Sequence, residues 1–236
     1  LNYRKFCLLE NKRPSELDSW KDIPAMPTDG FKQLTLATFP TKKAIKIFKT
    51  SGSTGKSRGL HFFDTLRLYE EAIQPPFQRF LMPDGGDFNY CFLTSSPEDA
   101  PDSSLSHMMG VVNRVWAKKK GIYYVSKDEV LRDRLCSDLK SVKKRIFLLA
   151  TAFAIKSFLD HLKENKISIR LPKGSRLMET GGFKGRVLQI SKEALYRECE
   201  KRLGIANDYC VSEYGMTELS SQFYDTTLWD KMNDVR

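Results

Sequence analysis

The ten residues from Thr50 to Gly59 combine the groups that proteins use to bind phosphate. The segment reads T-S-G-S-T-G-K-S-R-G, so hydroxyls, glycines and two cations follow one another closely. Glycines let backbone amides approach an anion, hydroxyls donate hydrogen bonds to phosphate oxygens, and Lys56 or Arg58 supplies positive charge. The composition predicts a phosphate-binding loop, with a flexible surface loop as the alternative.

The Walker loop of nucleotide-binding proteins fits this segment only in part. Gly55-Lys56-Ser57 matches the end of the pattern G-x-x-x-x-G-K-S/T, but Thr50 stands where the first glycine belongs. A Walker loop also opens a helix, whereas the residues from Gly59 to Phe63 predict an extended segment. The Walker pattern is therefore not the basis of our interpretation.

The segment instead resembles the phosphate-binding signature of the adenylate-forming superfamily, T/S-S-G-S/T-T-G-x-x-K/R-G, and matches it at every defined position. The superfamily includes acyl-CoA ligases, luciferase-like enzymes and peptide-synthetase adenylation domains. The resemblance implies an ATP site in which Lys56 takes part in catalysis. The nucleotide-binding residues that it implies here are Thr50, Ser51, Gly52, Ser53, Thr54 and Gly55.

A second segment, S-E-Y-G-M-T-E from Ser212 to Glu218, resembles the superfamily motif Y-G-x-T-E. The resemblance implies that Tyr214 stacks on adenine beside Gly215, and that Thr217 donates a hydrogen bond to the α-phosphate. It also implies that Glu218 is catalytic and holds Mg²⁺, a cation that prefers carboxylate and phosphate oxygens. A helix cap formed by Thr217 is the structural alternative.

The string E-T-G-G-F-K-G-R at residues 179–186 precedes this motif. In adenylate-forming enzymes a glycine turn here lines the adenine pocket, so the resemblance implies nucleotide contacts at Gly181 and Gly182. The string is similar to that of acyl-protein synthetases, which supply fatty acyl groups to the reductase of bacterial bioluminescence. D-I-P-A-M-P from Asp22 and the pair Phe31-Lys32 resemble the same subgroup. A tight turn with positive φ at either glycine is the structural alternative.

His107 lies where the superfamily often has a histidine or an aromatic residue near the acyl carboxylate, which implies a catalytic role. A buried or surface histidine on an amphipathic helix is equally compatible with the sequence. His61 and His161 have no comparable sequence context.

The regular elements that would position these segments begin at residue 44. We predict strands at 44–48, 88–93, 122–125, 145–150 and 209–211, and residues 176–179 lead to the glycine pair at 181–182. We predict helices after an N-cap at Asp64 (interrupted or ended at Pro75-Pro76) and at 104–118, 130–139, 155–162 and 191–203. This alternation predicts an α/β fold with mostly parallel strands flanked by helices, as in the large N-terminal domain of an adenylate-forming enzyme. Ligands of such sheets bind beyond the carboxyl ends of the strands.

The domain organisation follows from where regular patterning starts. Residues 1–43 are interrupted by prolines and predict an irregular segment packed on the domain, and residues 44–236 predict the ATP-binding adenylation domain. Because neither Leu1 nor Arg236 looks like a natural terminus, we interpret the chain as a fragment without the C-terminal domain. The family's catalytic lysine and acyl-carrying cysteine are not identifiable in it.

The charge is unevenly distributed. The 39 basic and 29 acidic residues give a net charge of +10, and eleven basic residues lie between Arg114 and Arg145. That stretch lacks the interleaved aromatics of a single-strand binder and matches no DNA-binding motif. A solvated helix face is the better interpretation, so nucleic acid is not among the predicted partners.

Cysteine spacing and hydropathy limit the setting in which the protein works. The five cysteines show no CxxC spacing, which argues against zinc or a disulfide scaffold and predicts a reducing cytoplasm. No stretch approaches the roughly 18 apolar residues of a membrane helix, so we predict no membrane span.

The reaction implied by the resemblance is ATP-dependent activation of a fatty acid as its acyl-adenylate. The acyl group would then pass to a protein thiol, such as that of an acyl reductase. Backbone amides, Lys56, Thr217 and Mg²⁺ on Glu218 suit the stabilisation of charge on the α-phosphate. An acyl- or aryl-CoA ligase of the same superfamily and a non-enzymatic, basic nucleotide-binding module remain the alternatives.

Overall fold

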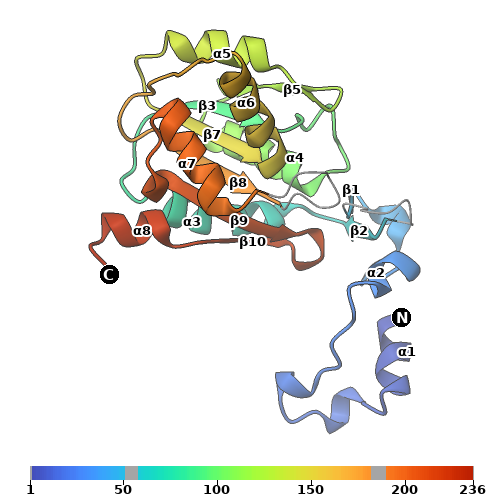
Figure 1. Ribbon diagram of the computed structural model, residues 1–236. Helices are drawn as coiled ribbons and strands as arrows, with labels where there is room; N and C mark the ends of the chain where they lie inside the picture. Colours follow the sequence, from blue (N-terminus) through green and yellow to red (C-terminus); the bar gives the residue numbers. More distant parts are fainter. Residues whose placement is uncertain (1, 51–57, 182–189, 236) are drawn as a thin grey trace.

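A six-stranded sheet forms the centre of the protein in the computed structural model, which describes residues 2–50, 58–181 and 190–235 (Figure 1). The strand order is β10–β9–β8–β7–β3–β4, and all neighbours are parallel except β10, which is antiparallel to β9. The strands are β3 Asn89–Leu93, β4 Ile122–Tyr123, β7 Ile146–Thr151, β8 Arg176–Thr180, β9 Cys210–Met216 and β10 Ser221–Tyr224. This sheet confirms the predicted α/β class.

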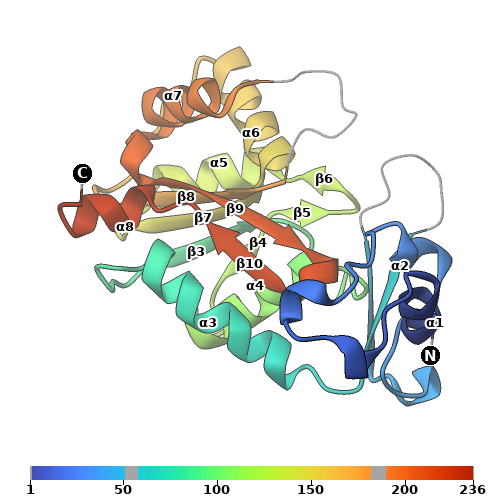
Figure 2. The ribbon, with the colours of Figure 1, turned by 90° about the horizontal axis from the view of Figure 1, so that it is seen from below.

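Helices cover both faces of the sheet (Figure 1, Figure 2). One face packs against α5 Arg132–Lys140, α6 Ala152–Glu164 and α7 Lys192–Leu203. The other packs against α3 Arg67–Leu81, α4 Ser104–Val115 and α8 Thr227–Met232. Successive residues of β7 serve opposite faces, since Leu148 packs with the first set and Leu149 with the second. A strand buried on both faces explains why its sequence is apolar throughout.

Two small antiparallel hairpins lie outside the main sheet. One pairs β1 Lys46–Lys49 with β2 Leu60–Phe63, and the other pairs β5 Val125–Ser126 with β6 Glu129–Val130. The first connects through the glycine-rich segment and therefore fixes the two ends of that loop.

Side-chain caps set the start of three helices. Ser103, Thr151 and Ser191 accept hydrogen bonds from the backbone amides of Ser106, Ala154 and Ala194, respectively, at 3.1–3.2 Å. The predicted cap at Ser191 is confirmed, because these hydroxyls satisfy amides that have no partner within the helix.

The prediction for α3 was wrong at both ends. The helix begins at Arg67 after Leu66, not at an Asp64 cap, and it runs through Pro75-Pro76 to Leu81. Prolines remove two backbone donors, but the helix continues because one face is buried. The buried residues at four-residue spacing are Tyr69, Ile73, Phe77 and Leu81.

The N-terminal arm, residues 2–43, contains α1 Asn2–Leu9 and α2 Gly30–Gln33, and its described side chains are exposed or half-buried. Figure 1 shows α1 standing apart from the sheet. The side-chain amide of Asn2 donates a hydrogen bond to the carbonyl of Thr35 at 2.9 Å. Helix α2 meets the domain where the Phe31 ring stacks on His61, with 4.6 Å between ring centroids. The domain boundary at residue 44 stays a prediction.

In the three described ranges, no helix combines the length and apolar character needed to cross a membrane.

Candidate functional site

The ends of the glycine-rich loop are closed together by backbone and side-chain hydrogen bonds. The Thr50 amide donates to the Gly59 carbonyl at 3.0 Å, and the Gly59 amide donates to Thr50 Oγ1 at 2.9 Å. Thr50 is buried, and the extended segment predicted after Gly59 is confirmed as β2. The remaining predicted loop residues lie outside the described part of the chain: Ser51, Gly52, Ser53, Thr54, Gly55 and Lys56.

A side chain at Gly59 would be tightly confined at the base of this loop. A Cβ there would lie 3.1 Å from Thr50 Cγ2 and 3.2 Å from the carbonyl oxygen of Phe31. The absence of a side chain therefore lets α2 pack directly on the loop base.

The Y-G-M-T-E segment and the start of α4 meet at the carboxyl end of the sheet. Thr217 opens a short 3-10 helix directly after β9, and its Oγ1 lies 2.9 Å from Ser104 Oγ. The amide of Lys49 donates to the carbonyl of Asp102 at 2.8 Å, and its Nζ lies 3.0 Å from Asp102 Oδ2. The loop base and the Y-G-M-T-E segment thus contact residues two positions apart at the start of α4, Asp102 and Ser104.

Glu218 lies close enough to act electrostatically on two titratable side chains, Lys32 and His61. Hydrogen bonding to Asp29 raises the pKa of Lys32, and the charge of Glu218 adds to this. Burial lowers the pKa of His61, and the charge of Glu218 opposes that shift. Glu218 therefore faces the region where α2 meets β2.

Glu218 and Thr217 offer a carboxylate and a hydroxyl oxygen, the ligand types that Mg²⁺ prefers. Among the described residues no group of three or more His, Cys, Asp or Glu side chains gathers to hold a metal ion. A lone carboxylate fits Mg²⁺ that arrives with nucleotide phosphates, since such sites use one or two carboxylates together with phosphate oxygens. The magnesium role of Glu218 stays a prediction.

His61 has a structural context that its sequence position did not reveal. Its side chain is 7% exposed, and Nε2 has no hydrogen-bond partner among the described residues. It is the cross-strand partner of Phe48, two residues beyond Gly59. Because side chains alternate between the two faces of a strand, His61 lies on the same face of β2 as Phe63. This two-residue period is the sequence signal that could have identified His61 as an inward-facing residue.

The predicted adenine-binding residues lie at the ends of β8 and β9. Tyr214 is 59% exposed, so its ring is available for stacking. Gly215 has no space for a Cβ, because the carboxyl of Glu213 occupies it. Gly181 has φ of 77°, which confirms the expected positive-φ turn, whereas Gly182 lies outside the described residues.

His107 lies one helical turn beyond Ser104, so both residues share a face of α4. Its Nε2 is 2.9 Å from Glu70 Oε1, and its ring contacts Phe48 and Tyr69 at centroid distances of 5.4 and 5.9 Å. Burial lowers the pKa of His107, and Glu70 partly offsets this. The imidazole is therefore neutral at pH 7.

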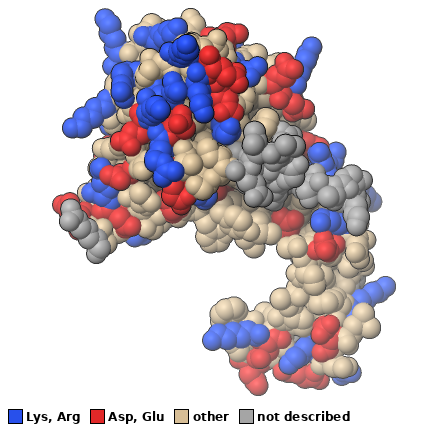
Figure 3. All heavy atoms as spheres, viewed as in Figure 1, with Lys and Arg blue, Asp and Glu red and all other residues tan. Residues whose placement is uncertain are grey.

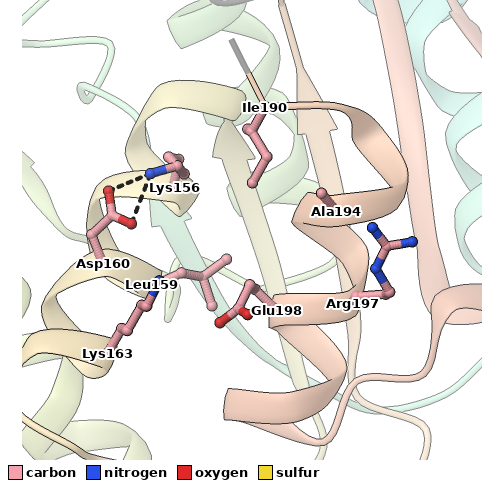
Figure 4. Close-up of a pocket in the computed structure, with 8 residues that line it drawn as sticks. All are labelled: Lys156, Leu159, Asp160, Lys163, Ile190, Ala194, Arg197 and Glu198. Carbon is pink, nitrogen blue, oxygen red and sulfur yellow. Dashed lines mark hydrogen bonds and ion pairs between the residues drawn. The ribbon is translucent and has the colours of Figure 1, made fainter. Parts of the chain in front are cut away.

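A separate pocket of about 260 Å³ lies between α6 and α7 (Figure 4). Lys156 on its wall is paired with Asp160 at 2.6 Å. Lys and Arg side chains gather over this part of the surface, interspersed with acidic groups (Figure 3). The other lining residues are Leu159, Lys163, Ile190, Ala194, Arg197 and Glu198. These helices cover the sheet face opposite to α4, so the pocket is not part of the candidate site.

No protein-family model and no curated protein matches this sequence. A solved structure with a partly similar arrangement is titled "Structure of ATP bound RpMatB-BxBclM chimera B3". The match has a TM-score of 0.47 and 15% sequence identity, and it covers 80% of this chain and 32% of the chimera. The chain thus spans about a third of the length of that protein.

Proposed function

We propose that the protein binds ATP at the carboxyl edge of the sheet and uses it to activate a carboxylic acid as an acyl-adenylate. The observation that carries the proposal is the hydrogen bond between Ser104 and Thr217. With the contacts between Lys49 and Asp102, it brings the base of the phosphate-signature loop and the Y-G-M-T-E segment to one place.

In the proposed reaction, a carboxylate oxygen attacks the α-phosphorus of ATP, and the bond to the β-phosphate bridging oxygen breaks. Pyrophosphate leaves with the electron pair of that bond. Loop amides, Lys56 and Thr217 would orient the phosphates and stabilise the charge that builds on them. Mg²⁺ on Glu218 would neutralise phosphate charge.

We expect Glu218→Gln to reduce acid-dependent exchange of pyrophosphate into ATP by about 100-fold, a typical loss when one charge-stabilising group is removed. The exchange should be measured with the whole protein that contains this chain, and ATP binding by calorimetry with and without MgCl₂. Glu164→Gln, at the exposed end of α6, is the matched control and should exchange like wild type.

Three other outcomes would change the proposal. Exchange at the wild-type rate in Glu218→Gln would remove Glu218 as the metal ligand. Tight ATP binding that is steeply salt-dependent and indifferent to acids would favour the non-enzymatic, basic nucleotide-binding module. Failure to bind ATP would refute the proposal.

We further propose that the acid is a medium or long fatty acid, that its acyl group passes to a protein thiol, and that the protein works in the cytoplasm. The resemblance of residues 179–186 to acyl-protein synthetases supports the substrate. The apolar face of α4 beside His107 consists of Leu105, Met108, Met109 and Val112. It gives no support to the substrate, because Leu105 is partly buried and the other three are fully buried in the core beside α3. The five cysteines are free, as a reducing compartment requires.

Chain-length dependence tests the substrate class. Each buried methylene contributes about 0.8 kcal/mol, so the affinity should rise roughly fourfold per methylene until the pocket is full. Exchange rates should be compared from acetate to palmitate and against phenylacetate and benzoate. A preference for the aromatic acids, or transfer to free CoA instead of a protein thiol, would favour the CoA-ligase alternative.

A further inference from the structure

The carboxylate of Glu70 on α3 is shared by two side chains of α4. Oε1 lies 2.9 Å from His107 Nε2, and Oε2 lies 2.6 Å from Arg114 Nη2. A carboxylate in this position accepts hydrogen bonds, and a guanidinium only donates them. Nε2 of His107 must therefore carry the proton, and Nδ1 of the neutral ring carries a lone pair.

The imidazole ring is held in place by packing as well as by Glu70. Phe48 of β1 and Tyr69 of α3 lie against it, and the Tyr69 hydroxyl donates to the carbonyl of Ser104 at 3.1 Å. The side chain of His107 is only 17% exposed. A ring fixed on two sides keeps its Nε2 directed at Glu70.

Three charged groups around His107 act on its protonation. Burial is the main cause that lowers its pKa, Glu70 raises it, and Lys46 of β1 and Arg114 of α4 lower it further. Tyr69 is the other titratable group against the ring. The net result is a neutral imidazole at pH 7, with Glu70 as the carboxylate that would stabilise an added proton.

From this geometry we propose that Glu70 is a positioning residue that fixes the Nε2–H form of His107, so that a carboxylate binds there only together with one proton. A lone pair on Nδ1 repels a carboxylate oxygen, whereas an Nδ1–H donates to it. The proton comes from solvent and goes to Nδ1, leaving an imidazolium between Glu70 and the bound carboxylate. The carboxylate ligand rests on the proposed function, but the tautomer does not.

The tautomer can be measured in the protein without ligand by long-range ¹H–¹⁵N NMR of His107 at pH 7.5. We expect the Nε2–H form in wild type and in Glu71→Gln, an exposed neighbour on α3 that undergoes the same chemical change. In Glu70→Gln we expect a mixture of both tautomers, with Glu70→Asp retaining the Nε2–H form. A wild-type Nδ1–H form, or an unchanged tautomer in Glu70→Gln, would overturn the inference.

Proton uptake provides the second measurement. Octanoate binding should be followed by calorimetry at pH 7.5 in phosphate and Tris, whose ionisation enthalpies differ. We expect about one proton taken up per octanoate in wild type and Glu71→Gln, and clearly less in Glu70→Gln. Octanoate binding without proton uptake would refute the inference and leave the proposed function standing. No octanoate binding would count against the fatty-acid substrate, while the NMR measurement would still decide the role of Glu70.

Discussion

Replacing Arg176 by methionine is expected to lower the free energy of unfolding by about 3 kcal/mol, the lower end of the cost of breaking a buried ion pair, because Asp84 keeps some solvent contact and also pairs with Arg145. Arg176 is fully buried at the start of β8, and its two terminal nitrogens bond to Asp84 at 2.9 and 3.0 Å. Nη1 also donates to the Leu81 carbonyl at 2.6 Å, and the guanidinium lies 4.5 Å from the ring centre of Phe88. The substitution would leave both Asp84 and a helix-end carbonyl short of a donor.

Asp84 depends on this arginine for its charge. Burial alone would raise the pKa of Asp84, but the hydrogen bonds and charge of Arg176, followed by the charge of Arg145, hold it below its ordinary value. A carboxyl whose pKa is lowered by folding stabilises the folded state fully only when the pH is above the pKa of that carboxyl in the unfolded chain. The stabilisation from Asp84 is therefore lost as the pH falls below about 4. The reciprocal change Asp84→Asn should be as costly as Arg176→Met, since it leaves a buried cation without its counter-charge.

Urea unfolding of Arg176→Met, Asp84→Asn and the double variant Arg176→Met/Asp84→Asn tests this account. The double variant should lose at least 1 kcal/mol less than the sum of the two single losses, because replacing both partners leaves no unpaired buried charge. Arg132→Met, at the exposed start of α5, should change stability by no more than about 0.5 kcal/mol. A loss below 1 kcal/mol in Arg176→Met would mean that the pair does not stabilise the fold.

The order of strands and helices could be predicted because each central strand is a short apolar run between turn residues. The five predicted strands correspond to β1, β3, β4, β7 and β9, and the residues that lead to the glycine pair form β8. By contrast, β10 was missed, because Ser221–Tyr224 is not a continuous apolar run and its return depends on Ser220 at φ 51°. A left-handed turn at a residue other than glycine gives little sequence signal.

Long-range contacts limited what could be predicted of the candidate site. The two motifs were visible as strings, but the contact between Ser104 and Thr217 joins residues 113 positions apart. Glu70 is a charged residue on a helix, a pattern that normally indicates a solvated face. Its role follows only from the way α3 packs on α4. The burial of Arg176 was missed for the same reason. Arginine is seldom fully buried without a partner, and its partner Asp84 is 92 positions away in the sequence.

Replacing Glu213 by glutamine is expected to stabilise the protein by about 3 kcal/mol at pH 8 and to have little effect at pH 4.5. Glu213 is 5% exposed near the end of β9, where it accepts a hydrogen bond from Thr180. Burial raises its pKa from 4.5 to about 7, against the effect of Thr180 and with a further increase from Glu179. The isosteric amide keeps the shape of the side chain and cannot ionise.

The stabilising direction of Glu213→Gln at high pH follows from the linkage between protonation and folding. A raised pKa in the folded state means that the folded protein holds the proton more tightly than the unfolded chain. The stability associated with this proton is complete below pH 4.5 and is lost as the pH rises through about 7. A shift of this size corresponds to about 3 kcal/mol, since each pKa unit is worth about 1.4 kcal/mol.

The difference in unfolding free energy between Glu213→Gln and wild type isolates this effect from other titrations. The lowered pKa values of His61 and His107 make stability rise with pH over part of the same range, but they are common to both proteins. Denaturant unfolding at pH 4.5, 6, 7 and 8 should show a difference that grows with pH. Glu200→Gln, the same chemical change at an exposed position on α7, is the matched control. A constant difference for Glu213→Gln would mean that the pKa of Glu213 is the same in the folded and unfolded states.

The position of Glu213 gives a reason for a residue that destabilises the fold near neutral pH. Glu213 lies between Thr180, which ends β8, and Gly215, whose missing side chain leaves space for the carboxyl. It therefore joins the two strand ends that carry the proposed adenine-binding residues. A buried acid that destabilises the fold near neutral pH is expected where precise placement of a binding site matters more than stability.

If that is its role, Glu213→Ala should weaken ATP binding, whereas Glu213→Gln, which retains an acceptor for Thr180, should preserve the affinity. Equal affinity in both variants would show that Glu213 has no part in placing the site.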